Sequence, residues 1–89
     1  MELFVSNLNT EVRDDDLYQL FIKFGEVQSV IIIKDTFTNI CRGFAFIKMK
    51  ELEAEDAVRH LNNTLFMQRS INVHVATIKQ IHTYNTYLK

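Results

Sequence analysis

Cysteine, long apolar runs and an excess of either charge are all scarce in this 89-residue chain. The single cysteine, Cys41, excludes an internal disulfide and is typical of a reducing compartment. The longest aliphatic run, Val30–Ile33, is too short for a membrane-spanning helix, and the N-terminus has no features of a secretory signal. Proline is absent, and no repeat or low-complexity segment divides the chain. These absences predict one small intracellular domain, in the cytoplasm or the nucleus, without a membrane partner.

Motifs of the common catalytic and metal-binding sites are also missing. The chain contains no G-x-S-x-G, P-loop or H-E-x-x-H sequence. Cys41 has no histidine near it in the sequence, and the histidines have no ligand-like spacing with cysteine or carboxylates. A copper chaperone would need a C-x-x-C pair, which one cysteine cannot provide. We therefore expect no enzyme activity, no catalytic residue, no cofactor and no bound metal.

The net charge of −1 argues weakly against nucleic acid as a partner, but the distribution of the charges matters more. Acidic residues gather around residues 14–16 and 51–56, in two segments predicted to be helices. Arg42, Lys48 and Lys34 lie in or beside predicted strands. If both helices cover one side of a sheet, the other side has a mildly basic surface.

The most informative segment is an octet, residues 42–49, that alternates with a period of two. One face of an extended strand there carries two cations and two rings, Arg42, Phe44, Phe46 and Lys48. The other face carries small and aliphatic residues on which a helix can pack. Rings between cations suit base stacking and phosphate binding. A half-buried strand whose rings face a second layer, with the cations reaching solvent, explains the same pattern, and the octet alone does not decide between the two.

Hydrophobic periodicity predicts the order βαββαβ. We expect strands at residues 2–7, 27–34, 42–49 and 71–76, with a short extra strand or hairpin arm at 65–67. Two right-handed crossovers then give an α+β fold, a ferredoxin-like sandwich whose four-stranded antiparallel sheet has both helices on one face.

The helices are indicated by apolar stripes. The first is marked by Leu17, Leu20, Phe21 and Phe24, with Asp14 or Thr10 as its cap and Gly25 as a left-handed end. The second covers residues 51–61 and is expected to bury Leu52, Ala54, Ala57, Val58 and Leu61.

Apolar and loop residues outside the core are harder to assign. The strand at 27–34 places Ile31 and Ile33 on the open face of the sheet. Asn39 suits a tight loop turn with positive φ, and Phe37 at the loop tip is explained by local packing or by an RNA contact, of which we favour packing.

The tail, residues 78–89, suggests a short helix with Ile78, Ile81 and Leu88 near one side and Tyr84 close by. One interpretation is that such a helix lies across the sheet as a displaceable lid. The other, which we favour, is a frayed tail or a contact with another protein.

The octet resembles the first ribonucleoprotein signature of the RNA recognition motif (RRM) family, from which only Met49 departs. Leu3-Phe4-Val5-Ser6-Asn7-Leu8 matches the shorter second signature completely. Both signatures occur in the family's order and at about its spacing. The resemblance covers residues 2–76 and suggests an RRM domain over residues 1–77.

The resemblance to the RRM family implies a monomeric module that binds single-stranded RNA without catalysis. The resemblance implies that Phe4 and Phe44 each stack under a base and that Phe46 inserts against a sugar. Arg42 is expected to contact a phosphate. Three further residues are expected to line the same face: Lys48, Ser6 and His74.

The alternative function is a protein-interaction module on the same fold, which binds a peptide or a partner domain. Relatives of that kind typically have degenerate signatures, so the two intact signatures argue against it. The modest charge and the apolar Ile31 and Ile33 remain compatible with a protein partner.

Overall fold

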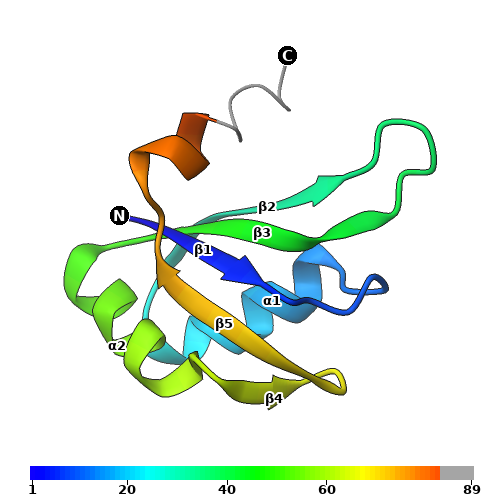
Figure 1. Ribbon diagram of the computed structural model, residues 1–89. Coiled ribbons are helices and arrows are strands. Elements are labelled where there is room, and N and C mark those ends of the chain that lie inside the picture. The colour runs from blue at the N-terminus through cyan, green and yellow to red at the C-terminus, as the bar shows by residue number, and fades with distance from the viewer. Residues whose placement is uncertain (83–89) are drawn as a thin grey trace.

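The computed structural model describes residues 1–82 of the chain. Its elements, in chain order (Figure 1), are β1 (Glu2–Ser6), α1 (Asp14–Phe21), the 3-10 helix η1 (Ile22–Phe24), β2 (Val27–Lys34), β3 (Cys41–Met49), α2 (Glu51–Leu61), β4 (Thr64–Phe66) and β5 (Arg69–Val75). Residues 78–82 add a helical turn after β5. Within residues 1–82, no helix is both long enough and apolar enough to cross a membrane.

The strands form one antiparallel sheet in the order β2-β3-β1-β5-β4. Figure 1 shows α1 and α2 together on one face of this sheet. The predicted α+β sandwich is therefore confirmed, although the sheet has five strands and not four. The additional strand, β4, pairs with the start of β5 and corresponds to the hairpin arm expected at residues 65–67.

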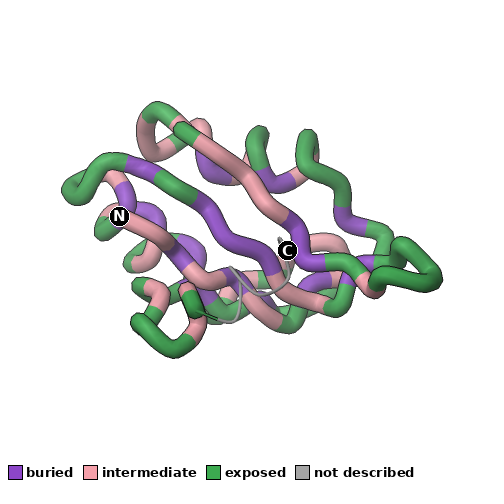
Figure 2. Tube along the Cα trace, turned by 90° about the horizontal axis from the view of Figure 1, so that it is seen from above, coloured by how far each residue is buried: buried purple, intermediate pink, exposed green. Residues whose placement is uncertain are grey.

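The core lies between the sheet and the two helices. The three central strands supply it through alternate residues, which are Leu3, Val5, Ala45, Ile47, Met49, Ile71 and Val73. The helices add Leu17, Phe21, Ala54, Ala57 and Leu61. Exposed residues gather instead in the connecting loops (Figure 2), most clearly between β2 and β3. No helix of residues 1–75 covers the other face of the sheet, which leaves several of its side chains accessible to a ligand.

The first helix begins without the cap expected from Asp14 or Thr10. Arg13 is the N-cap residue, and its backbone N–H donates a hydrogen bond of 2.9 Å to Oδ2 of Asp16. The acidic side chains of the first turn also complement the partial positive charge at the helix N-terminus. The expected cap is thus wrong, because a carboxylate inside the helix reaches back to the N-cap.

Gly25 ends η1 in a conformation that differs from the left-handed helical one expected. Its φ of 151° and ψ of −175° lie in a region that is essentially restricted to glycine. A Cβ at this position would lie 2.2 Å from Cδ of Glu53. Glycine therefore allows the side chain of Glu53, from α2, to pack directly against the chain after η1.

Two expectations about apolar side chains are wrong. Leu52 is 77% exposed. It lies two residues before Ala54, about 200° around the helix axis, so both cannot face the sheet. Phe37 is 97% exposed at the tip of the β2–β3 loop, which excludes local packing. The loop itself turns as expected, with Asn39 at φ 60°.

Candidate nucleic-acid interface

The face of the sheet opposite the helices carries a cluster of aromatic rings from three adjacent strands. Phe4 lies on β1, Phe44 and Phe46 lie on β3, and His74 lies on β5. The strand register places Phe4 directly opposite Phe46 on one side and His74 on the other. The period of two predicted from the sequence therefore brings these four side chains together as expected.

Phe4 is the centre of this cluster. Its ring centroid lies 5.5 Å from that of Phe44, 5.3 Å from that of Phe46 and 5.4 Å from that of His74. The interplanar angles are 37°, 65° and 44°, so the rings meet tilted or edge to face and do not form one stack. Such contacts stabilise the orientation of each ring. Phe4 and Phe44 stay partly exposed and His74 is exposed, so these rings remain accessible.

Phe46 differs from the other rings because only 2% of it is exposed. Ile33 on β2 is likewise 3% exposed, and neither residue belongs to the core cluster between the sheet and the helices. Ile31, directly opposite Phe46 in the register, is partly buried. The exposed apolar patch expected at Ile31 and Ile33 is therefore absent. In this conformation Phe46 is also too buried to make the expected contact with a sugar.

The polar residues predicted for this face surround the rings. Arg42 and Lys48 are both exposed on β3. Ser6 lies between Phe44 on β3 and Asn72 on β5 in the strand register.

Two residues of this face were missed at the sequence level. Asn72 is exposed beside Ser6, and Glu2 lies directly opposite Lys48. The same period of two along β1 and β5 identifies both of them. The carboxylate of Glu2 reduces the positive potential that Lys48 supplies at its end of the face.

The helical turn after β5 begins with a reciprocal pair of hydrogen bonds. The backbone N–H of Gln80 donates to Oγ1 of Thr77 (3.1 Å), and the backbone N–H of Thr77 donates to Oε1 of Gln80 (2.9 Å). This capping box is readable in the sequence as Thr followed three residues later by Gln, and it was missed. The short helix expected in residues 78–89 thus forms at 78–82. Leu88 and Tyr84 of its predicted stripe lie outside the described residues.

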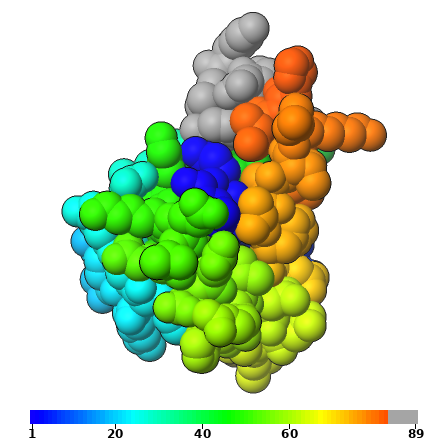
Figure 3. Space-filling model, turned by 90° about the vertical axis from the view of Figure 1, so that its left-hand side faces the viewer, coloured from blue at the N-terminus to red at the C-terminus, as the bar shows by residue number. Residues whose placement is uncertain are grey.

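Gln80 also connects this turn to the aromatic cluster. Its Nε2 lies 3.3 Å from Nε2 of His74, which accepts a hydrogen bond when the imidazole proton is on Nδ1. Ile81 is partly buried, whereas Ile78 is 85% exposed. In Figure 3 these residues (orange) lie at the opposite end of the molecule from α2. The turn therefore stands on the sheet side, next to a ring of the candidate site.

Comparison with known proteins places these features in a family. The family model for the RNA recognition motif matches residues 3–72. Protein elav of Drosophila melanogaster is 42% identical over 78 residues, which cover 86% of this chain and 16% of that protein. An uncharacterized RNA-binding protein of Schizosaccharomyces pombe is 36% identical over 83 residues, which cover 92% of this chain and 28% of that protein. The chain thus spans less than a third of these relatives.

Solved structures give the same result for the fold. The crystal structure of RNA-binding protein PG1 matches with a TM-score of 0.83 and 38% identity, over 85% of this chain and 93% of that one. A Sxl-lethal protein–RNA complex matches with a TM-score of 0.81 and 33% identity, over 84% of this chain and 47% of that one. With both signatures on adjacent strands of the same sheet face, the chain belongs to the RNA recognition motif family.

Proposed function

We propose that this chain binds single-stranded RNA, without catalysis, on the sheet face opposite the helices. The observation that carries the proposal is the group of accessible rings around Phe4, between the exposed cations Arg42 and Lys48. Aromatic faces beside cations suit unstacked bases joined by phosphates. The relatives support it, since one is named as an RNA-binding protein and one structure contains RNA. We further propose that the protein acts as a monomer and that its RNA partner is intracellular.

Each residue has a role that follows from its position. Phe4 and Phe44 stack under successive bases, each contributing about 1–3 kcal/mol. Arg42 and Lys48 contact phosphates at opposite ends of β3. Ser6 and His74 offer hydrogen-bonding groups to base edges or to the 2′-hydroxyl. Two stacked bases and a few polar contacts, after ordering costs, give a dissociation constant of ~1 μM.

Phe46 has a supporting role in the described conformation. Its edge-to-face contact with Phe4 fixes the orientation of that ring. A contact between Phe46 and a sugar requires that the residues covering it move away.

Replacing Phe4 and Phe44 together with Ala tests the proposal. We expect the double variant to lose binding to a fluorescein-labelled pool of random single-stranded RNA decamers, measured by fluorescence anisotropy. Since each ring contributes about 1–3 kcal/mol, losing both should weaken binding at least about thirtyfold. The control is Leu52→Ala, which removes an apolar side chain that is 77% exposed on α2, on the helix side of the sheet, and should leave affinity within about twofold.

Thermal unfolding of each variant shows whether it is folded. The lost rings lie outside the core cluster, so the double variant should remain folded at 25 °C. Unchanged RNA affinity in a folded double variant would refute the stacking assignment.

A further inference from the structure

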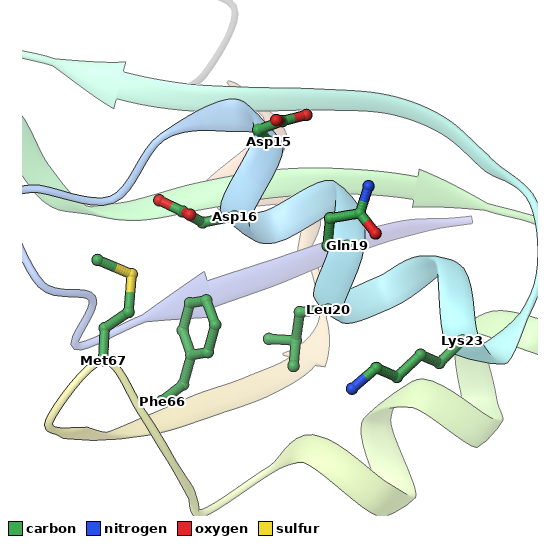
Figure 4. Close-up of a pocket in the computed structure, with 7 residues that line it drawn as sticks. All are labelled: Asp15, Asp16, Gln19, Leu20, Lys23, Phe66 and Met67. Atoms are coloured by element: carbon green, nitrogen blue, oxygen red, sulfur yellow. The ribbon is translucent and has the colours of Figure 1, made fainter.

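A groove separate from the sheet face runs between α1 and the β4–β5 hairpin (Figure 4). It has a volume of about 440 Å³. The residues that line it are Asp15, Asp16, Gln19, Leu20, Lys23, Phe66 and Met67. Because α1 covers the other face of the sheet, this groove and the RNA face can be occupied at the same time.

The floor of the groove is apolar. Figure 4 shows Leu20 of α1 and Phe66 of β4 pointing toward one another, with Met67 beside Phe66. All three pack against the edge of the core but remain only partly buried. Covering this floor with an apolar group from another molecule would remove further apolar surface from water.

The hairpin side of the groove is held in place by its turn. Met67 and Gln68 have φ values of 49° and 70°, as in a two-residue hairpin turn that normally prefers Asn and Gly. Nδ2 of Asn9 donates to the carbonyl oxygen of Met67 (3.0 Å), and Nε of Arg69 donates to the carbonyl oxygen of Asn7 (3.1 Å). The strained turn is thus tied to the connection after β1, and Met67 is positioned before any partner arrives.

Charge on the rim determines what kind of partner fits. Asp15 and Asp16 lie at the N-terminal end of α1, and Lys23 lies at the far end of the groove. One oxygen of Asp16 accepts the N–H of Arg13, whereas among residues 1–82 no basic side chain pairs with Asp15. The acidic end therefore repels RNA phosphates and attracts a Lys or Arg side chain.

We propose that this groove binds a short basic peptide segment of a partner protein. One large apolar side chain of the peptide inserts between Leu20 and Phe66, and a neighbouring Lys or Arg lies beside Asp15. The volume is at the lower end of the range for ligand pockets, about 300–1,000 Å³, and suits one side chain with its neighbours. The site is independent of RNA binding and would allow the module to bind RNA and a protein together.

A pair of synthetic peptides tests the apolar anchor. The probe is the hexapeptide Lys-Arg-Lys-Trp-Lys-Gly, titrated into ¹⁵N-labelled protein, and its control has Ala in place of Trp. We expect the Trp peptide to shift the amide resonances of Leu20, Phe66 and Met67 and to bind about tenfold more tightly than the control. Equal affinity of the two peptides, no binding below ~1 mM, or shifts at Phe4 and Phe44 instead would overturn the proposal.

Two protein variants that each change the charge by one unit test the location. Gln19→Lys adds a positive charge to the rim of the groove, whereas Glu51→Gln removes a negative charge from the first turn of α2, which does not line the groove. We expect Gln19→Lys to weaken binding of the Trp peptide about threefold and Glu51→Gln to weaken it less than about 1.5-fold. Equal effects of the two substitutions would show that the peptide is attracted by the overall negative charge of the protein and not by this groove. Concentration-dependent shifts of the same resonances without peptide would assign the groove to a second copy of the chain.

Discussion

At the scale of single residues, the contact between Gly25 and Glu53 joins the end of η1 to α2. Glycine is needed there for its φ of 151°, and the atoms that a Cβ would meet are those at the end of the Glu53 side chain. We expect Gly25→Ala to lower the free energy of unfolding by about 1–3 kcal/mol through backbone strain, with a smaller further loss as the flexible Glu53 side chain moves aside. Urea unfolding followed by circular dichroism measures the change.

Gly43→Ala is the matched control for this substitution. Gly43 also has a positive φ, 94°, but the nearest atom to a Cβ there is a carbonyl oxygen of Leu8 at 3.7 Å, an ordinary contact. The Gly43→Ala variant should therefore show the cost of backbone strain alone and lose less stability than Gly25→Ala. Adding Glu53→Ala to Gly25→Ala should recover part of the loss. Equal losses at both glycines would mean that the packing of Glu53 against Gly25 contributes little.

The candidate site shows how far single residues could be predicted from the sequence. A period of two along β1, β3 and β5 correctly put Phe4, Phe44, Phe46 and His74 on one face. Periodicity specifies the face of a side chain but not what lies above that face, so the burial of Phe46 could not be predicted from it. The exposure of Leu52 was predictable, because its angular distance from Ala54 on α2 follows from helix geometry.

At the scale of elements, the main strands and helices were predictable because each has an unbroken apolar pattern. The bounds expected for β2 and α2, residues 27–34 and 51–61, are those of the structure. The start of α1 was not predictable in the same way, since its N-cap is Arg13, a residue type without a usual capping side chain. Side-chain contacts between residues close in sequence decide such ends, and apolar periodicity does not report them.

The helical turn after β5 leads to a prediction about access to the RNA face. A chain that ends at Thr77 lacks Gln80, which contacts His74, and Ile81, which is partly buried on the sheet side. We expect this truncated chain to bind single-stranded RNA about two- to fivefold more tightly, as when the competent form is about half to a fifth of the intact population. Its amide resonances should shift at Ile31, Ile33 and Phe46.

A point variant of the intact chain is the companion to this truncation. Gln80→Ala removes both the hydrogen bond to His74 and half of the capping box. The RNA affinity of this variant should therefore lie between those of the intact and truncated chains. If neither the RNA affinity nor the resonances of Phe46 change on truncation, the segment after β5 does not cover the face.

At the scale of the whole molecule, charge separates the two faces of the sheet. The acidic side chains in the first turns of α1 and α2, such as Asp14 and Glu51, lie on the helix side, whereas Arg42 and Lys48 are on β3. The net charge of −1 therefore hides a mildly basic face, as the sequence suggested. Because Glu2 lies opposite Lys48, this basic character is concentrated near Arg42.

This separation predicts a shallow salt dependence of RNA binding. Each phosphate contact to single-stranded RNA contributes a slope of about −0.7 to the plot of log K against log salt, so two or three contacts give about −1.4 to −2.1. Arg42→Ala should reduce the slope by about 0.7, and Lys48→Ala by less, because Glu2 already offsets part of that charge. Anisotropy titrations of the wild-type chain and both variants between 50 and 400 mM KCl measure the slopes. A wild-type slope near −5 would require several more basic contacts than Arg42 and Lys48 provide, and equal slopes for the two variants would show that Glu2 does not weaken the contact of Lys48.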